Sequence, residues 1–513
     1  MSRTSYALSH EQYTFKNALS WGNCRGHWEL GLEESLKTKT IIHYLIALVE
    51  LPPIIGRIAS LFETVIVLYF NLSIKKNSRS PLLTIPKDIT LHIMENYLEI
   101  GEVLKTGSTC KEFYKQIKDI ANPITRTPPK NITDDQLKQL IQIYPDLIYL
   151  DLSECSEITD AGLAHLAGTS LQHLSLSKCY NLSGAGLVHL KDLPLKRLDL
   201  SFCNKLNNVE LAHLTGMPLL YLDLSCCYNI SNEGLSYLRN MPLEHLELIR
   251  CYRLTDEGLA YLAGMPLTHL SLSLCCNLTD AVLAHLANMP LEHLDLSNCR
   301  NLTGTGFIHL IGKPLQHLDL SSCCDLNEEE FVHLRELPLQ RLYLYGCNNL
   351  TNDSLGFFAN MPLQYLDLSS CTWLTDDGLL HLVGKPLRGL DLSLCRNLTN
   401  AGLAHLRKMP LEELKLCDCI DLKDAGLAYL REMPLRHLDL CSCDWLTDEG
   451  LARLGNLPLQ HLDLSGCEKL TDASLVHLAK MPLRCLDLSS CLRLTKTAVP
   501  QLHLALPNAE IIF

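Results

Sequence analysis

Histidine and acidic residues recur at multiples of 24 positions, and this pairing could bind a metal ion or respond to pH. The histidines are His173, His245, His269, His293, His317, His437 and His461. The residue two positions after this site is acidic in eleven copies: Asp151, Asp199, Asp223, Glu247, Asp295, Asp319, Asp367, Asp391, Asp439, Asp463 and Asp487. The alternative is structural: the repeat places the acidic residue, and the neighbouring histidine gains a hydrogen bond. We favour this alternative, because the repeat itself accounts for both residues.

Fifteen cysteines, from Cys155 to Cys491, also follow each other at intervals of 24 residues. A free cysteine in an apolar strand pattern behaves as a small buried hydrophobic residue. A long array of free thiols is best kept in a reducing compartment, so the pattern predicts a cytoplasmic protein without disulfides. The C-x-C pairs Cys417/Cys419 and Cys441/Cys443 lack the usual zinc spacing, and we expect no metal and no cofactor.

No catalytic motif is found, and the charge excludes some partners. The sequence contains no G-x-S-x-G, no Gly-rich phosphate loop and no H-E-x-x-H, so we expect no catalytic residues and no enzyme. The net charge of −13 argues against nucleic acid and against anionic membrane surfaces as partners of the repeats. The apolar segment 41–72 contains Glu50, Arg57 and Glu63 and is broken by two prolines, so it is too interrupted to span a membrane. We expect buried helices there, with membrane contact as the alternative.

The repeated unit has the form L-x-x-L-x-L-x-x-C-x-x-L-T-D-x-G-L-x-x-L-x-x-M-P. In one copy Leu291, Leu294 and Leu296 alternate with polar residues, as in a strand with one buried face. Thr-Asp before Gly-Leu predicts a helix start, as at Thr159, Thr255 and Thr447, whose side chains would cap free amides. A strict period of 24 residues predicts a solenoid rather than one globular core.

This unit resembles the leucine-rich repeat, in particular its cysteine-containing subtype, over residues 147–513. The resemblance implies an α/β horseshoe of fifteen units, with parallel strands on the concave face and helices on the convex face. Residues 132–140 would be the helix half of a unit without a strand before it, and residues 509–513 a closing strand. We therefore expect an N-terminal region (1–80), a small helical module (81–121), a linker with a half-repeat cap (122–146) and the solenoid (147–513).

Departures from the repeat on the outward strand positions are candidates for binding a protein substrate. They are Arg341, Tyr343, Tyr345, Glu413, Lys415, Asp418, Ile249, Arg250 and Phe202. Tyrosine and arginine often anchor interfaces, so we expect Tyr343 and Tyr345 at the centre. Trp373 and Trp445 could extend this patch. The alternative is neutral drift on a solvated sheet.

Residues 81–121 form a separate segment. Ile89, Ile93 and Tyr97 recur at intervals of four, which indicates an amphipathic helix. The order Ile85-Pro86-x-Asp88-Ile89, followed by Cys110-Lys111-x-Phe113, resembles an F-box. The resemblance implies contacts with a Skp-type adaptor through Ile85, Pro86, Ile89, Ile93, Leu98 and Leu104. The alternative is a helical cap that shields the first repeat.

Together, the two segments resemble an F-box/leucine-rich-repeat protein. The resemblance implies a non-catalytic substrate receptor of an SCF-type cullin ubiquitin ligase, with a protein substrate on the concave face. Such uniform repeats also occur in bacterial effectors that imitate this machinery, which would place the protein in the host cytosol. The alternative is a non-enzymatic interaction scaffold, or an effector, without a link to ubiquitin.

Overall fold

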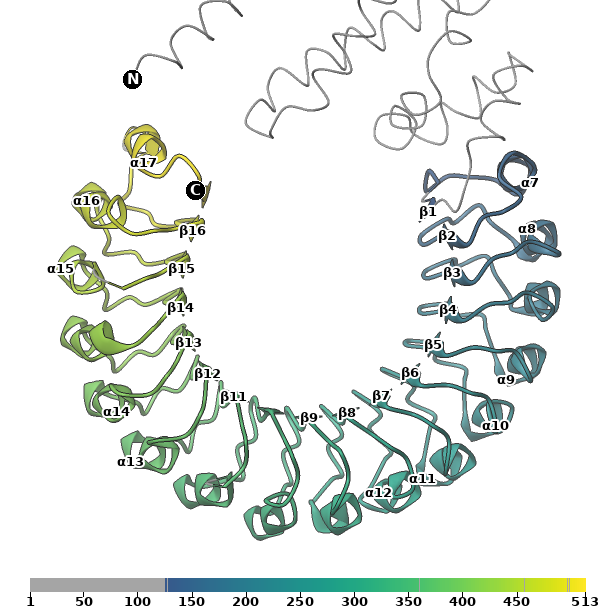
Figure 1. Ribbon diagram of the computed structural model, residues 1–513, viewed down its shortest axis with the longest axis horizontal. Coiled ribbons are helices and arrows are strands. Elements are labelled where there is room, and N and C mark those ends of the chain that lie inside the picture. The colour runs from purple at the N-terminus through teal and green to yellow at the C-terminus, as the bar shows by residue number, and fades with distance from the viewer. Residues whose placement is uncertain (1–124, 127, 359, 456, 496, 498) are drawn as a thin grey trace, which may run out of the picture. The chain divides into compact units, whose positions relative to one another are not determined.

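The computed structural model describes residues 125–513 apart from residues 127, 359, 456, 496 and 498. The helical module at 81–121, its six expected adaptor contacts and the apolar segment 41–72 lie outside the described residues. The described part is a curved solenoid with strands along its inner rim and helices along its outer rim (Figure 1). None of the helices in this described part is both long enough and apolar enough to cross a membrane.

Parallel strands form one continuous sheet in chain order, and each residue pairs with the residue one repeat later, as His293 does with His317. The strands are β1 (Thr125–Arg126), β2 (Tyr149–Asp151), β3 (His173–Ser175), β4 (Arg197–Asp199), β5 (Tyr221–Asp223), β6 (His245–Glu247), β7 (His269–Ser271), β8 (His293–Asp295), β9 (His317–Asp319), β10 (Arg341–Tyr343), β11 (Tyr365–Asp367), β12 (Gly389–Asp391), β13 (Glu413–Lys415), β14 (His437–Asp439), β15 (His461–Asp463), β16 (Cys485–Asp487) and β17 (Glu510–Ile512). The sheet of fifteen repeats and its horseshoe curvature confirm the predicted α/β solenoid.

Short helices follow the strands from β1 to β16 on the convex side. The α-helices are α7 (Asp134–Ile143), α8 (Asp160–Leu163), α9 (Asn208–Leu211), α10 (Asn232–Ser236), α11 (Asp256–Leu259), α12 (Ala281–Leu286), α13 (Asp376–Leu379), α14 (Asn400–Leu406), α15 (Asp448–Ala452), α16 (Leu475–Leu478) and α17 (Val499–Ala505). The 3₁₀ helices are η4 (Ala164–Leu166), η5 (Ala185–His189), η6 (Ala212–Leu214), η7 (Ala260–Leu262), η8 (Thr305–Leu310), η9 (Glu328–His333), η10 (Asn352–Phe358), η11 (Leu380–Leu382), η12 (Asp424–Glu432) and η13 (Asp472–Ser474).

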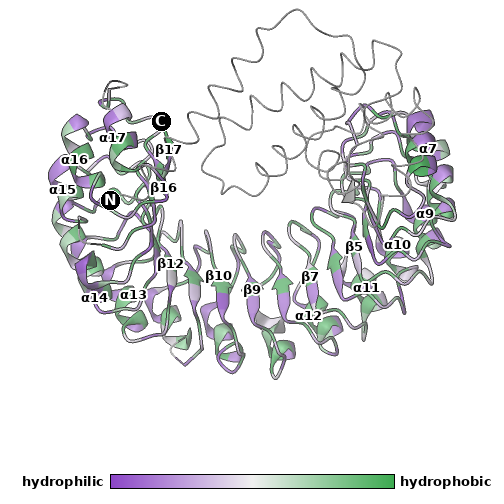
Figure 2. Ribbon diagram, turned by 45° about the horizontal axis from the view of Figure 1, so that its top comes forward, coloured by the Kyte–Doolittle hydropathy of each residue, from purple (hydrophilic) through white to green (hydrophobic). Residues whose placement is uncertain are grey.

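The core lies between the sheet and these helices. Leu291, Leu294 and Leu296 are at most 2% exposed, as the alternation of the strand predicts. Hydrophobic and hydrophilic residues occur together on the strands and on the helices (Figure 2). A unit of this length cannot bury its apolar side alone, so each repeat uses its two neighbours to complete the core.

The repeat cysteines do more than fill space in this core. From Cys179 to Cys491, fourteen thiols donate to the carbonyl oxygen of the leucine 27 residues earlier, at sulfur–oxygen distances of 3.1–3.4 Å. Burial raises the pKa of the Cys179 thiol to about 12, so this thiol remains protonated and unreactive at neutral pH. The ladder of thiols therefore links consecutive repeats through the core.

A tight turn precedes each of these cysteines. The residue before the cysteine has a φ between 51° and 70° in all fifteen units, and thirteen of these residues are not glycine. In one unit the amide of Cys299 donates to the carbonyl of Leu296, and Asn298 has the positive φ of the third residue in a type II turn. The amide of Asn298 also donates to Ser321 in the next repeat at 2.7 Å, which holds this turn in place.

On the convex side, carboxylate and amide side chains bridge adjacent repeats. The amide of Thr279 donates to Asp256 Oδ1 at 3.0 Å, and this kind of contact is found at twelve places in all. The predicted capping role is confirmed for Thr159, which accepts from Ala161. It is wrong for Thr255 and Thr447, because their side chains make no cap hydrogen bond to their own helices. The repeat interface is thus the main use of this motif.

The first described strand corrects one expectation. Helix α7 was predicted to have no strand before it, but β1 precedes it and pairs in parallel with β2. The two residues of β1 lack the leucine pattern of the repeat, which is why the sequence did not reveal them. At the other end, β17 pairs with β16 after α17.

Candidate binding surface on the concave sheet

Three columns of side chains run across the concave sheet. They consist of the residues two, four and six positions after the first leucine of each unit, such as His293, Asp295 and Ser297. We call them the first, second and third columns. Because neighbouring strands are about 4.8 Å apart, side chains in one column lie within reach of each other. Fifteen units give a surface roughly 70 Å long along the arc.

The second column is mainly structural. Ten of its eleven acidic residues accept a hydrogen bond from the backbone amide two residues later, as Asp295 does from Ser297 at 2.9 Å. Burial, supplemented by the nearby Asp295 and Asp367, raises the pKa of Asp319 to about 6 against the hydrogen bonds from Ser321. These carboxylates hold the ends of the strands, which supports the structural explanation of the acidic pattern.

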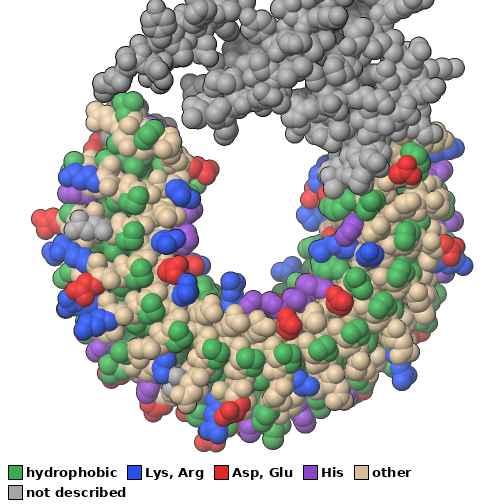
Figure 3. Space-filling view, viewed as in Figure 1, with side chains coloured by type: hydrophobic (Ala, Val, Ile, Leu, Met, Phe, Trp, Pro, Cys, Tyr) green, Lys and Arg blue, Asp and Glu red, His purple; other side chains and the backbone are tan. Residues whose placement is uncertain are grey.

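The first column contains an aromatic ladder, defined here as Tyr221, His245, His269, His293 and His317. Adjacent ring centroids in this ladder are 4.6, 4.9, 4.0 and 3.9 Å apart, in chain order. The guanidinium of Arg197 lies 3.5 Å from the ring centroid of Tyr221, in cation–π contact at one end. Histidine side chains line the inner rim in Figure 3. The period of 24 residues thus builds a row of ring contacts across five strands, which is stacked from His245 to His293 and edge-on between His293 and His317.

The expected bond between a histidine and its acidic neighbour forms at His245, whose Nε2 lies 2.6 Å from Glu247. At His269 the ring Nδ1 instead pairs with the hydroxyl of Thr268 at 2.9 Å. Burial lowers the pKa of His293 to about 4, and the neighbouring His269 and His317 contribute in the same direction. His293 is therefore neutral at physiological pH and suited to stacking.

The strand β10 carries the predicted centre of the binding surface. Arg341 and Tyr345 are exposed, Tyr345 by 42%, and Tyr343 is half-buried. The ring of Tyr343 lies 5.4 Å from that of Tyr365 on the adjacent strand β11. We call Arg341, Tyr343 and Tyr345 the β10 group. Its two aromatic rings and one cation lie between Tyr365 on β11 and the end of the aromatic ladder at β9.

The other predicted residues form two separate groups. On β13 and its turn, Lys415 lies 3.6 Å from Asp391 and 3.4 Å from Glu413, and Asp418 pairs with Arg396 at 3.1 Å. Phe202, Ile249 and Arg250 follow β4 and β6, and Lys178 lies 5.9 Å from the Phe202 ring. With β4 and β13 nine strand steps apart, or roughly 43 Å, the structure does not bring all predicted residues into one patch.

Two expectations about this face need correction. Trp445 is only 7% exposed, and its indole donates to the carbonyl of Cys419 at 2.8 Å, so it does not extend the patch. Trp373 makes the equivalent bond to Cys347 at 2.7 Å. The expectation of no disulfide is also wrong, because Cys417 and Cys441 form one between adjacent repeats.

Sequence reasoning missed Tyr365 and Gly389, which neighbour the β10 group. A Cβ at Gly389 would lie 2.4 Å from the Tyr365 ring, so only glycine leaves room for this tyrosine in its observed position. The signal was present, because a glycine interrupts the first column one repeat after a tyrosine. The Tyr365 ring therefore extends the aromatic surface of the β10 group toward Gly389 on β12.

Comparison with known proteins identifies the repeat type. A family model for the leucine-rich repeat matches residues 217–238, 287–308, 359–383, 433–455 and 455–479. No curated protein is similar enough in sequence to count as a relative. A chain from the yeast Rad7 and Elc1 complex is 19% identical, with a TM-score of 0.45, and the match covers 80% of this chain and 95% of that one. A chain from the TLR13–ssRNA13 complex is 20% identical, with a TM-score of 0.45 and coverage of 75% and 65%. The family matches and the 24-residue register of the sheet together identify the solenoid as a leucine-rich-repeat scaffold.

Proposed function

We propose that the chain is the substrate receptor of an SCF-type cullin ubiquitin ligase. The observation that carries this proposal is the presence, in one chain, of the F-box-like order in residues 83–120 and a leucine-rich-repeat sheet with a group of exposed non-repeat side chains. The first segment would dock on a Skp-type adaptor, and the sheet would hold a protein substrate. Each part would be of limited use without the other.

The β10 group is the proposed centre of substrate contact. Arg341 and Tyr345 are accessible, and Tyr343 packs beside Tyr365, so the group combines a cation with firmly placed aromatic rings. Side chains of this kind supply much of the energy at protein interfaces, because they bury a large area at a low cost in conformational entropy. The curvature of the solenoid surrounds this group with the remaining strands, which fits a convex or extended protein segment.

The chemistry would be carried out by other subunits of the ligase. The receptor would raise the local concentration of a substrate lysine at the charged ubiquitin-conjugating enzyme. Such an effect requires one site for the adaptor and one for the substrate in the same chain. It requires no reactive residue in this chain.

The test is co-purification of the full-length chain with a Skp-type adaptor, followed by titration calorimetry. We expect one-to-one binding that is lost in the Ile89→Ala/Leu98→Ala variant. Circular dichroism of this variant should match the wild type, because the substitutions lie outside the repeats. The Tyr343→Ala/Tyr345→Ala variant is the matched control and should bind the adaptor normally.

A second function is a leucine-rich interaction scaffold without a link to ubiquitin. It is favoured by the same concave sheet, which needs no adaptor to bind a protein. Absence of adaptor binding by the folded wild type would support this second function. If the circular dichroism of the Ile89→Ala/Leu98→Ala variant showed that the repeats had unfolded, residues 83–120 would be identified as a cap of the solenoid.

A further inference from the structure

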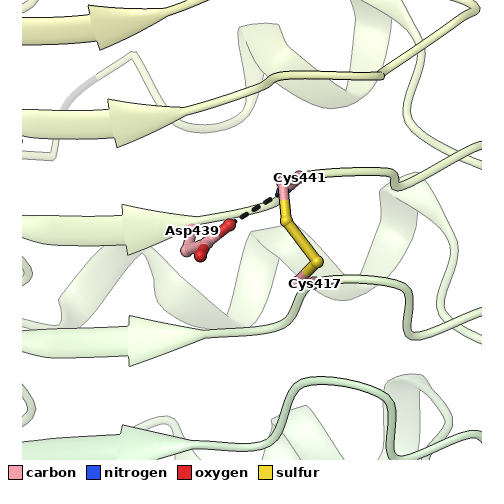
Figure 4. Close-up of side chains that lie close together, drawn as sticks. All are labelled: Cys417, Asp439 and Cys441. Carbon is pink, nitrogen blue, oxygen red and sulfur yellow. Dashed lines mark hydrogen bonds between the residues drawn. A yellow bond between two sulfur atoms is a disulfide. The ribbon is translucent and has the colours of Figure 1, made fainter. Parts of the chain in front are cut away.

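The third column changes its chemistry at two adjacent repeats. This column holds serine in eleven of the fifteen units, but Cys417 and Cys441 take its place in two consecutive ones. Their Cα atoms are 4.7 Å apart, and the side chains form a disulfide across the sheet (Figure 4). This separation lies within the usual range for a disulfide, so the parallel register alone brings the two sulfurs together.

A carboxylate lies beside this pair. Asp439 Oδ1 accepts the amide of Cys441 at 2.9 Å, which orients the side chain next to the sulfurs. The two sulfurs and a carboxylate oxygen all lie within 4.8 Å of one another. Among residues 125–513 as the structure describes them, this is the one group of histidine, cysteine or acidic side chains that brings three potential ligand atoms so close.

We propose that the reduced form of this trio, Cys417, Asp439 and Cys441, binds one Zn²⁺ ion. Two thiolates and a carboxylate are ligands that zinc accepts, at about 2.3 Å for sulfur and about 2.1 Å for oxygen. A tetrahedral ion at these distances needs sulfurs roughly 3.8 Å apart. Because the Cα atoms are 4.7 Å apart, rotation of the two short side chains provides this spacing without movement of the sheet.

The oxidation state of the two cysteines controls the site. A dithiol reductant supplies two electrons and two protons to the S–S bond, and leaves as its own disulfide while two thiols form. Binding of Zn²⁺ then releases the two thiol protons to solvent, because the ligands are thiolates. In the disulfide both sulfurs are consumed by the S–S bond, so the oxidised chain has no thiolate for the metal. The inference is independent of the proposed ligase function.

The position of the trio distinguishes it from the other cysteines of the repeats. The fifteen repeat cysteines are buried in the core, and fourteen of them donate to a main-chain carbonyl of the preceding repeat. Cys417, Asp439 and Cys441 are half-buried on the concave side, where solvent and metal can reach them. Three protein ligands leave a fourth position on the ion open to water or to a side chain of a partner.

The test uses Co²⁺ as a spectroscopic probe on the full-length chain, reduced with a phosphine and freed of metal under argon. We expect one equivalent of Co²⁺ per chain to produce thiolate-to-cobalt absorption, which Zn²⁺ then removes by displacement. The untreated, oxidised chain should produce none. Asp439→Asn should weaken Co²⁺ binding by at least about tenfold, the lower end of what loss of even an outer-shell partner costs.

The repeat supplies a matched control. Cys417→Ser/Cys441→Ser restores the serine found in eleven other units, so this variant should keep the circular dichroism of the wild type and lose the absorption. Cys324→Ser, at an exposed cysteine outside the trio, should keep it. Equal absorption in the double variant, or none in the reduced wild type, would overturn the proposal. So would a disulfide that stays closed in the reductant, shown by alkylation and mass spectrometry, because a closed pair cannot bind metal.

Discussion

The thiol of Cys299 donates a hydrogen bond to the carbonyl oxygen of Leu272 across 3.3 Å, and so connects one repeat to the preceding one. Cys299 is fully buried, and the next thiol in the ladder, that of Cys323, repeats the contact with Leu296 at 3.2 Å. The cysteine is therefore a hydrogen-bond donor between repeats as well as a small core residue.

Replacement of Cys299 by alanine should destabilise the solenoid by about 1–2 kcal/mol, since it removes this bond and leaves a small void. Cys299→Ser should cost less if its hydroxyl keeps the contact with Leu272. Hydrogen exchange of the amides in β7 and β8 is the suitable measurement, because a repeat array can open locally. Cys324→Ala, at an exposed position, is the control and should leave exchange unchanged. Equal protection in all variants would show that the bond contributes nothing.

Asp280 should be among the most sensitive positions on the convex side. Its carboxylate accepts from the amide and hydroxyl of Thr303 and from the amides of Gly304 and Gly306, at 2.7–3.2 Å. Asp280→Ala leaves these donors without their acceptor and should cost about 2–3 kcal/mol. Asp280→Asn should be milder, because other repeats use asparagine here, as at Asn232. Urea denaturation followed by circular dichroism measures the difference, and equal losses in both variants would contradict this view.

The environment of Asp280 should also make the stability of the solenoid depend on pH in the acidic range. Burial opposes its charge, but the hydrogen bonds from Thr303, Gly304 and Gly306 outweigh burial and lower the pKa of the carboxyl below its usual value. The folded state therefore binds this proton less readily than the unfolded chain. The stabilisation is present above the unfolded pKa near 3.9 and is lost as the pH falls through the folded value. Below this window the wild type and Asp280→Asn should unfold at similar urea concentrations.

The aromatic ladder should weaken in mild acid. The pKa of His293 is about 4 in the folded chain, against an ordinary value near 6.5. Between these two pH values the imidazole is therefore protonated in the unfolded chain and neutral in the folded chain. The contribution of His293 to stability is complete above pH 6.5 and is lost as the pH falls from about 6.5 to about 4. Solvent screening limits this loss to the order of 1 kcal/mol.

His293→Tyr isolates this effect, because tyrosine occurs in the same column at Tyr221. We expect the melting temperature of this variant to fall less than that of the wild type between pH 7 and pH 5. The comparison is needed because Asp319, with a raised pKa of about 6, acts in the opposite direction as it takes up a proton on folding. His405→Tyr on α14, outside the ladder, is the matched control. An identical pH response of His293→Tyr and the wild type would exclude this role for His293.

The β10 group should dominate binding of a protein to the concave face. Tyr343→Ala/Tyr345→Ala should lower the affinity for a concave-face partner by about 30-fold or more, the effect of losing about 2 kcal/mol at an interface centre. Tyr180→Ala is the control, because Tyr180 is 47% exposed and Tyr345 42%. The measurement is quantitative cross-linking of both variants with interacting proteins. A partner retained by the double variant and lost from the Tyr180 variant would place the site elsewhere.

The repeat explains why much of the fold could be predicted and why parts of the site could not. Leu291, Leu294 and Leu296 have the two-residue alternation of a strand, so their burial followed from local sequence. Trp445 shows the opposite case: its sequence position is at the sheet edge, but a hydrogen bond to Cys419 in another repeat draws it inward. Thr255 likewise has the local pattern of a helix cap, yet its hydroxyl accepts a hydrogen bond from the Asn232 amide in the preceding repeat and makes no cap bond to its own helix.

The sequence by itself determined the register, because a period of 24 residues places equivalent residues on adjacent strands, and buried leucines fix which side of each strand faces inward. Only the tertiary structure decided which neighbours in a column interact. It stacks His269 on His293 at 4.0 Å, separates the β4 and β13 groups, and joins Cys417 to Cys441. These outcomes depend on side-chain directions and on distances of a few ångströms between strands, which one-dimensional spacing does not contain.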